Sequence, residues 1–100
     1  MLILGLGTNL GDGLNNLRSA LQLLQKSSTI APLQISPVYT SSALLPAYAP
    51  AAWNRPYLNV ALACETSLSP FETLRQIKQI EKQLGREESQ RWAPRVIDID

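Results

Sequence analysis

The end of the chain, Val96–Asp100, alternates aliphatic and acidic residues in the order VIDID. An alternation with a period of two predicts a half-buried β-strand, and residues two positions apart lie on one face of such a strand. We therefore expect Asp98 and Asp100 to point together, about 6.6 Å apart along the strand, while Ile97 and Ile99 turn into the core. Two carboxylates at that separation suit a pair of hard divalent cations, as in many phosphoryl-transfer sites.

Three arginines, Arg86, Arg91 and Arg95, precede the two acids. Guanidinium groups bind phosphate oxygens through planar, paired hydrogen bonds, so arginines beside a carboxylate pair predict a polyphosphate ligand. Trp92 lies among them. The simpler alternative is a surface strand whose solvent face carries two acids. The arginines and the tryptophan favour the phosphate site.

Length and composition restrict the function further. A chain of 100 residues makes one domain, and its net charge of +1 gives no electrostatic reason to expect nucleic acid or a membrane surface as a partner. The chain has no histidine, so proton transfer would need another group, and its single cysteine, Cys64, is expected to be a small core residue. The apolar run Met1–Leu6 is too short for a signal peptide or a membrane span. We expect a cytoplasmic protein.

The first part of the chain predicts a strand, a turn and a helix. Leu2–Leu6 is expected to form an interior strand that enters a turn-rich segment, Gly5–Gly13. The glycine spacing there does not match a dinucleotide-binding motif, so a tight strand-to-helix turn is the preferred interpretation. Asp12 is the expected N-cap of a helix that ends near Lys26. Its apolar stripe is predicted to comprise Leu14, Leu17, Leu21 and Leu24.

The middle of the chain is proline-rich. Ile30–Tyr39 is expected to be an extended strand that Pro32 and Pro37 restrict to an edge or a bulged path. Residues 40–56 show no periodicity, yet the segment carries exposed large hydrophobic residues. It is either a disordered connection or a lid over an apolar ligand, and both interpretations stay open.

Two strong elements follow. Tyr57–Thr66 predicts a strand, with Tyr57 and Asn59 on the face away from the core, where they could line a pocket. The next segment predicts a helix capped by Ser69, Pro70 and Glu72 and ended by Gly85. Its buried stripe is expected to comprise Leu74, Ile77, Ile80 and Leu84. Its opposite face carries Arg75, Lys78 and Lys82 and is either solvated or a cationic approach to the acidic strand. The polar loop 85–94 is expected to be mobile until an anion organises its arginines.

Six motifs in order make the chain resemble the 6-hydroxymethyl-7,8-dihydropterin pyrophosphokinase family of folate biosynthesis. They are LGLGTNLGD, SPVY, YLNVALACET, SLSPFETL, IEKQLGR and the highly specific RWAPRVIDID. The resemblance implies an α+β, ferredoxin-like fold of order β-α-β-β-α-β, with an antiparallel sheet and both helices on one face. It also implies Mg²⁺-dependent transfer of pyrophosphate from ATP to the pterin hydroxymethyl group, with release of AMP.

The resemblance also implies roles for individual residues. Asp98 and Asp100 would hold two Mg²⁺ ions, and both would be catalytic together with Arg86 and Arg95. The residues expected to bind ATP are Lys78, Glu81, Arg86, Arg91, Trp92 and Arg95, and Trp92 would close over the site. The residues expected to bind the pterin are Ser41, Leu44, Tyr57, Asn59 and Asp98.

The chain departs from the family pattern at Glu88, where many members are basic, and at Thr40–Ala43, ahead of a longer lid. The family continues well beyond Asp100. Residues 1–100 are therefore expected to be a single pyrophosphokinase domain that lacks the C-terminal part of the fold, with an incomplete sheet and an exposed apolar patch. The protein is expected to be a monomer, as part of a longer enzyme that could be fused to dihydropteroate synthase. The alternatives are a ferredoxin-like module that binds RNA or a small molecule, and an inactive truncated pyrophosphokinase.

Overall fold

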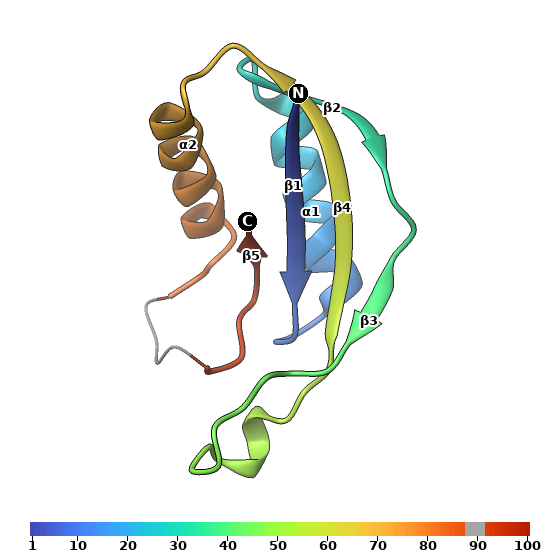
Figure 1. The fold of residues 1–100 in the computed structure, drawn as a ribbon, viewed down its shortest axis with the longest axis vertical. Coiled ribbons are helices and arrows are strands. Elements are labelled where there is room, and N and C mark those ends of the chain that lie inside the picture. The colour runs from blue at the N-terminus through green and yellow to red at the C-terminus, as the bar shows by residue number, and fades with distance from the viewer. Residues whose placement is uncertain (88–91) are drawn as a thin grey trace.

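The computed structural model describes residues 1–87 and 92–100, and it shows an α+β domain (Figure 1). Along the chain the elements are β1 (Leu2–Thr8), α1 (Gly13–Lys26), β2 (Ile30–Ile35), β3 (Tyr39–Ser41), the 3₁₀ turn η1 (Ala51–Trp53), β4 (Tyr57–Thr66), α2 (Pro70–Gln83) and β5 (Asp98–Ile99).

The strands form one antiparallel sheet in the order β2-β4-β1-β5, with β3 also paired to β4. The long pairing of β1 with β4 runs from Leu2 opposite Cys64 to Thr8 opposite Leu58. Both helices pack on the same side of this sheet (Figure 1). The fold class expected from the sequence is therefore confirmed.

The core lies between the sheet and the two helices. Leu4 and Leu6 of β1 and Leu62 of β4 are almost fully buried against it. The helices contribute Leu17, Ala20, Leu24, Ile77 and Ile80. Cys64 also lies in this core as expected, and burial raises the pKa of its thiol above the ordinary value. Because successive strand residues alternate between faces, Gly5, Gly7 and Asn59 lie on the opposite face.

The helix α1 begins and ends where the sequence indicates. The Asp12 carboxylate accepts a 3.2 Å hydrogen bond from Asn15 N, and the helix ends at Lys26. Two details were wrong. Leu14 is 56% exposed, because Ala20 completes the buried stripe instead. Gly5–Thr8 belong to β1, so the expected turn is confined to the four residues between β1 and the first helical residue, Gly13.

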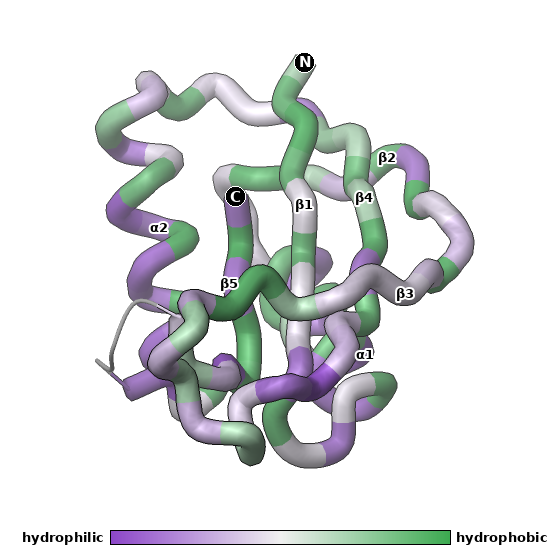
Figure 2. The backbone as a smooth tube through the Cα atoms, turned by 60° about the horizontal axis from the view of Figure 1, so that its bottom comes forward, coloured by the Kyte–Doolittle hydropathy of each residue, from purple (hydrophilic) through white to green (hydrophobic). Residues whose placement is uncertain are grey.

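The capping box that the sequence predicts for α2 is present, since Ser69 N donates to Glu72 Oε1 and Glu72 N donates to Ser69 Oγ, both at 3.2 Å. The predicted buried stripe is confirmed for Ile77 and Ile80, and Leu84 packs partly buried against the core, but Leu74 was wrong because it is 52% exposed. The face that meets the sheet is centred on Thr73, Ile77, Ile80 and Glu81. Figure 2 shows the alternation of hydrophobic and hydrophilic segments along α2.

The proline-containing strand β2 ends at Ile35, so the expected strand Ile30–Tyr39 is too long. Among the described residues β2 pairs only with β4, and it shifts register between Pro32 and Gln34, so the expected edge position and irregular path are confirmed. Segment 40–56 begins in β3 and contains η1, and Figure 1 shows it extending beyond the sheet. Within the part of the chain that the structure describes, no helix is long and apolar enough to cross a membrane.

Candidate active site

The two acidic residues lie on the open face of the sheet. β5 pairs with β1 so that Gly7 faces Asp98, and Gly5 and Asp100 exchange two backbone hydrogen bonds of 2.8 Å. Ile97 is fully buried and Ile99 is 6% exposed, whereas Asp98 and Asp100 both line a cavity. Strand β5 is shorter than the expected strand Val96–Asp100. The prediction that the two acids and the two isoleucines lie on opposite faces is confirmed.

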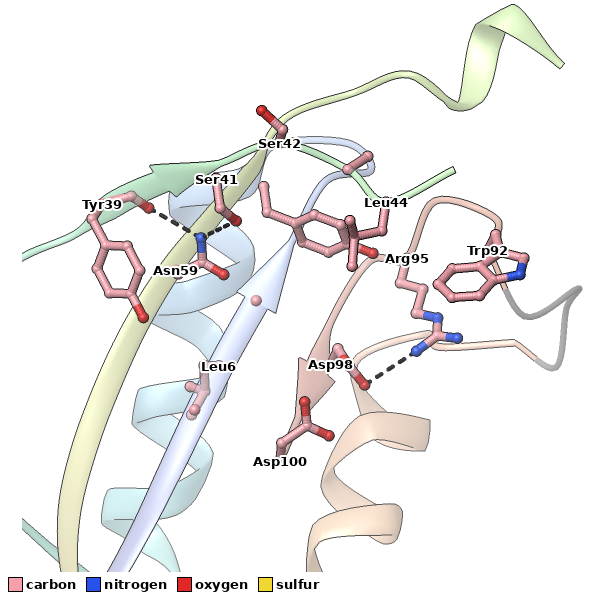
Figure 3. Close-up of a pocket in the computed structure, with 14 residues that line it drawn as sticks. Leu6, Tyr39, Ser41, Ser42, Leu44, Asn59, Trp92, Arg95, Asp98 and Asp100 are labelled. Atoms are coloured by element: carbon pink, nitrogen blue, oxygen red, sulfur yellow. Dashed lines mark hydrogen bonds and ion pairs between the residues drawn. The ribbon is translucent and has the colours of Figure 1, made fainter. Parts of the chain in front are cut away.

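This cavity has a volume of about 600 Å³ and is open to solvent. Gly5 and Gly7 line it from β1, and the chain around Tyr39–Leu44 lines a second side. Tyr57 and Asn59 come from β4, and Figure 3 shows Asn59 on one side of the cavity with the acids and Trp92 on the other. A ligand with a polar ring and a phosphate chain could contact both sides at once.

Asp98 is surrounded by positive charge. Its Oδ1 atom accepts a 2.9 Å hydrogen bond from Arg86 Nη1 and lies 3.4 Å from Arg95 Nη1 (Figure 3 shows the second contact). The loop that carries the arginines was expected to await an anion before becoming organised. For Arg86 this is wrong, because carboxylates of the protein already hold its side chain.

The second carboxylate that holds Arg86 is Glu81, a residue of α2 that is only 2% exposed. Glu81 Oε2 contacts Arg86 Nη1 and accepts a 3.0 Å hydrogen bond from Ile99 N. Glu81 Oε1 accepts no hydrogen bond from the residues described, and Lys78 Nζ lies 3.7 Å from it. A buried carboxylate needs such partners, so Glu81 joins α2 to β5 and to Arg86.

Asp100 is affected mainly by burial and by its acidic neighbours. Burial, followed by the negative charge of Asp98, raises the pKa of the Asp100 carboxyl above its ordinary value. A cation placed between the two carboxylates would reverse this effect, because an opposite charge favours the ionised form.

The donors fit a magnesium ion that binds together with nucleotide. Among the residues described, no group of three or more His, Cys, Asp or Glu side chains is gathered in a way that could hold a metal ion. Mg²⁺ is commonly held by one or two carboxylates, water and substrate phosphates. Asp98 and Asp100 could supply that share of a coordination sphere.

On the other side of the cavity, Asn59 is held in one orientation. Its Nδ2 atom donates to Ser41 Oγ at 2.9 Å and to Tyr39 O at 3.4 Å (Figure 3). Gly7 lies beneath it, and a Cβ atom at Gly7 would be 3.2 Å from Asn59 Oδ1. The absence of a side chain at Gly7 therefore leaves room for the amide.

The structure gathers most of the predicted site residues around one cavity. Those that line it are Ser41, Leu44, Tyr57, Asn59, Trp92, Arg95, Asp98 and Asp100. Arg86 contacts this group through Asp98, and Glu81 contacts it through Ile99 N. Lys78 lies on the surface of α2, where its side chain is 64% exposed. Arg91 lies outside the described residues.

Sequence reasoning missed Gly5, Gly7, Tyr39 and Ser42, which also line the cavity. Two glycines at alternate positions of a predicted strand could have indicated a bare surface beside a ligand.

The fold and this cavity define the class of protein. It is a ferredoxin-like domain whose open sheet face carries two carboxylates and arginines on one side of a cavity and the Asn59 amide on the other. Comparison with known proteins makes the assignment specific. The chain belongs to the 7,8-dihydro-6-hydroxymethylpterin-pyrophosphokinase family, whose model matches residues 3–100.

Relatives of the chain carry corresponding names. A 2-amino-4-hydroxy-6-hydroxymethyldihydropteridine pyrophosphokinase of Bacillus subtilis is 37% identical over 97% of this chain, and one of Aquifex aeolicus is 40% identical over 97%. A folate synthesis bifunctional protein of Chlamydia muridarum is 42% identical over 97% of this chain. The chain spans 55% and 56% of the first two relatives and 21% of the third.

Proposed function

We propose that this chain transfers pyrophosphate from ATP to 6-hydroxymethyl-7,8-dihydropterin, giving the pterin diphosphate and AMP. The observation that carries the proposal is the shared cavity, in which Asp98 and Asp100 face the same space as Asn59 and Tyr57. Membership of the family and the names of the relatives agree with this chemistry.

At the phosphate end, Asp98 and Asp100 would hold Mg²⁺, which when bound neutralises charge on the ATP phosphates. Arg95 is directed at the same space, 3.4 Å from Asp98, and would bind oxygens of the transferred group. Arg86 would share that task. A loose phosphoryl-transfer transition state requires mainly alignment and charge neutralisation, so these residues suffice without a histidine base.

At the other end, we assign Asn59, Tyr57, Ser41 and Leu44 to the pterin. Asn59 Nδ2 is occupied by Ser41 and Tyr39 O, so its Oδ1 is the atom that would accept a hydrogen bond from the ring edge. Trp92 and segment 40–56 would close over the ligands and exclude water, which otherwise competes as the acceptor. Lys78, Glu81, Arg91 and Trp92 complete the proposed ATP-binding set.

For the remaining properties we propose a cytoplasmic monomer, on the strength of the family resemblance. Fusion to dihydropteroate synthase is also proposed from the resemblance. The name "folate synthesis bifunctional protein" among the relatives is compatible with it.

The test is AMP release by the full-length protein carrying Asp98→Asn or Asp100→Asn. Each change keeps the side-chain shape and removes one proposed metal ligand, so we expect a rate at least about 100-fold lower, as when one stabilising group is removed from a transition state. Asp12→Asn is the matched control, because asparagine also caps helices well and Asp12 is remote from the cavity. Activity close to wild type in both cavity variants would disprove the assignment.

Calorimetry separates binding from turnover. Full-length protein titrated with a non-hydrolysable ATP analogue should bind it with Mg²⁺ and lose most of this affinity in the Asp98→Asn variant. Addition of the pterin should then produce a second binding signal. Equal nucleotide affinity with and without Mg²⁺ would contradict the metal role of the two acids.

A further inference from the structure

Asn9, in the turn between β1 and α1, connects three segments that are far apart in the sequence. Its Oδ1 atom accepts a 2.9 Å hydrogen bond from Arg95 N, and its backbone N donates to Arg95 O at 3.1 Å. Its Nδ2 atom donates to Arg55 O at 3.1 Å, at the end of segment 40–56. The orientation of the amide is unambiguous, because a peptide N–H only donates and a carbonyl oxygen only accepts.

The contact with Arg95 lies just beyond the pairing of β1 with β5, which ends at Gly7 opposite Asp98. Gly7 lies opposite Asp98, and the same register would place Asn9 opposite Val96. Asn9 instead bonds both backbone groups of Arg95. The chain therefore holds one extra residue between Arg95 and Asp98, an irregularity of the β-bulge type.

This irregularity decides where the Arg95 side chain points. In a regular strand, residues three positions apart lie on opposite faces, which would direct Arg95 away from Asp98. In the structure both side chains line the cavity, with Arg95 Nη1 3.4 Å from Asp98 Oδ1. Bulges commonly redirect a side chain in this way beside active sites.

The turn that carries Asn9 is well braced. Asn16 Nδ2 donates to Leu10 O at 2.8 Å and to Thr8 Oγ1 at 3.1 Å, and Thr8 is fully buried. On the other side Gly13 packs so closely on Leu58 that a Cβ atom there would lie 2.7 Å from Leu58 Cδ1. Several contacts besides those of Asn9 therefore hold this turn in place.

We infer that Asn9 is a positioning residue for the pyrophosphate transfer: its amide holds the bulge that directs Arg95 at the transferred group, and it joins Arg95 to segment 40–56 through Arg55. The inference rests on the proposed function, since it presumes that Arg95 acts on the phosphates. Asn9 itself is not among the residues that line the cavity.

The first test compares Asn9→Ala with Asn16→Ala in the full-length protein. Both variants lose two side-chain hydrogen bonds, but those of Asn16 go to Thr8 and Leu10 and reach neither Arg95 nor Arg55. We expect Asn9→Ala to lower kcat by a factor of about ten or more, because small misplacements of a catalytic group have large effects, with KM for the pterin changed by less. Asn16→Ala should keep kcat at similar thermal stability. Equal kcat losses would overturn the inference.

The second test is a double-mutant cycle with Arg95→Ala. If Asn9 acts through Arg95, Asn9→Ala should add almost nothing to the loss of kcat in the Arg95→Ala background. Full additivity would overturn the inference and leave the proposed function intact. A wild-type rate for Arg95→Ala alone would instead refute the proposed role of Arg95.

Should Asn9→Ala fold poorly, Asn9→Asp keeps the acceptor for Arg95 N and removes the donor to Arg55 O. We expect kcat within about threefold of wild type, since loss of one exposed neutral hydrogen bond is a small effect, together with a higher KM for the pterin. A kcat as low as that of Arg95→Ala would count against the positioning role.

Discussion

Arg86 joins Asp98 to Glu81: one nitrogen of its guanidinium contacts both carboxylates, at 2.9 Å from Asp98 Oδ1. Of these partners Glu81 is buried, whereas Asp98 faces the cavity in which we propose that Mg²⁺ binds. The arginine and the metal ion would therefore compete for the negative charge of the same carboxylate. This relationship has a measurable consequence for metal binding.

Replacement of Arg86 by alanine should strengthen Mg²⁺ binding in the absence of nucleotide, because Asp98 loses a competing cation. A partly exposed charge pair is worth about 1 kcal/mol, so the dissociation constant should fall by roughly a factor of five. At the same time kcat should fall, because we propose that Arg86 also neutralises charge on the phosphates. Lys82→Ala is the control for a lost positive charge nearby. Unchanged or weaker Mg²⁺ binding, measured by calorimetry, would contradict the competition.

Glu81→Ala should destabilise the fold by about 2–4 kcal/mol, because it leaves Ile99 N without its acceptor and Arg86 without its buried partner. Lys78→Ala removes the exposed member of the same group and should cost less than about 1 kcal/mol. Urea denaturation measures both free energies of unfolding. Similar losses for the two variants would show that the buried carboxylate is not the anchor between α2 and β5.

Glu72 makes the stability of the domain depend on pH. Hydrogen bonds from Ser69 lower the pKa of the Glu72 carboxyl from its ordinary value of 4.5. Because the folded-state pKa is lower than the unfolded one, this contribution is complete above about pH 5 and is lost as pH falls through the folded-state pKa.

The measurement for Glu72 is the thermal midpoint of wild type and of Glu72→Gln between pH 7 and pH 3. Glutamine can still complete a capping box but does not titrate. The wild-type advantage should therefore shrink towards low pH. Curves that stay parallel throughout would rule out this contribution.

Features that depend on neighbouring residues in the sequence were predictable. The capping box at Ser69 and Glu72, the N-cap at Asp12 and the alternation in Tyr57–Thr66 all appear in the structure. Each of these signals is local, since the partner lies within a few residues or the pattern repeats along one strand. The side of β5 on which Asp98 lies was predictable for the same reason.

Features that depend on distant partners were not predictable. A glutamate in the last turn of a helix normally faces water, and only the folded chain brings Ile99 N and Arg86 to Glu81. The spacing of Leu74 fits an apolar stripe. The elements that pack against α2 decide which of its faces is buried, and they cover the face that carries Thr73 instead. The sequence pattern does not reveal the extra residue between Arg95 and Asp98, because the hydrogen bonds between Asn9 and Arg95 define it.

Gly7→Ala should weaken binding of the pterin without weakening binding of the nucleotide. The new methyl group would lie 3.2 Å from Asn59 Oδ1 and 3.4 Å from Tyr57 Cδ1, so the amide must move by a few tenths of an ångström from its place between Ser41 and the ring. We expect KM for the pterin to rise roughly tenfold, about the effect of one misplaced hydrogen bond. Gly5→Ala adds the same group two residues away on the same face, where no atom lies within 4 Å. If Gly5→Ala raises KM as much as Gly7→Ala does, crowding of the cavity in general explains the effect, and displacement of Asn59 does not.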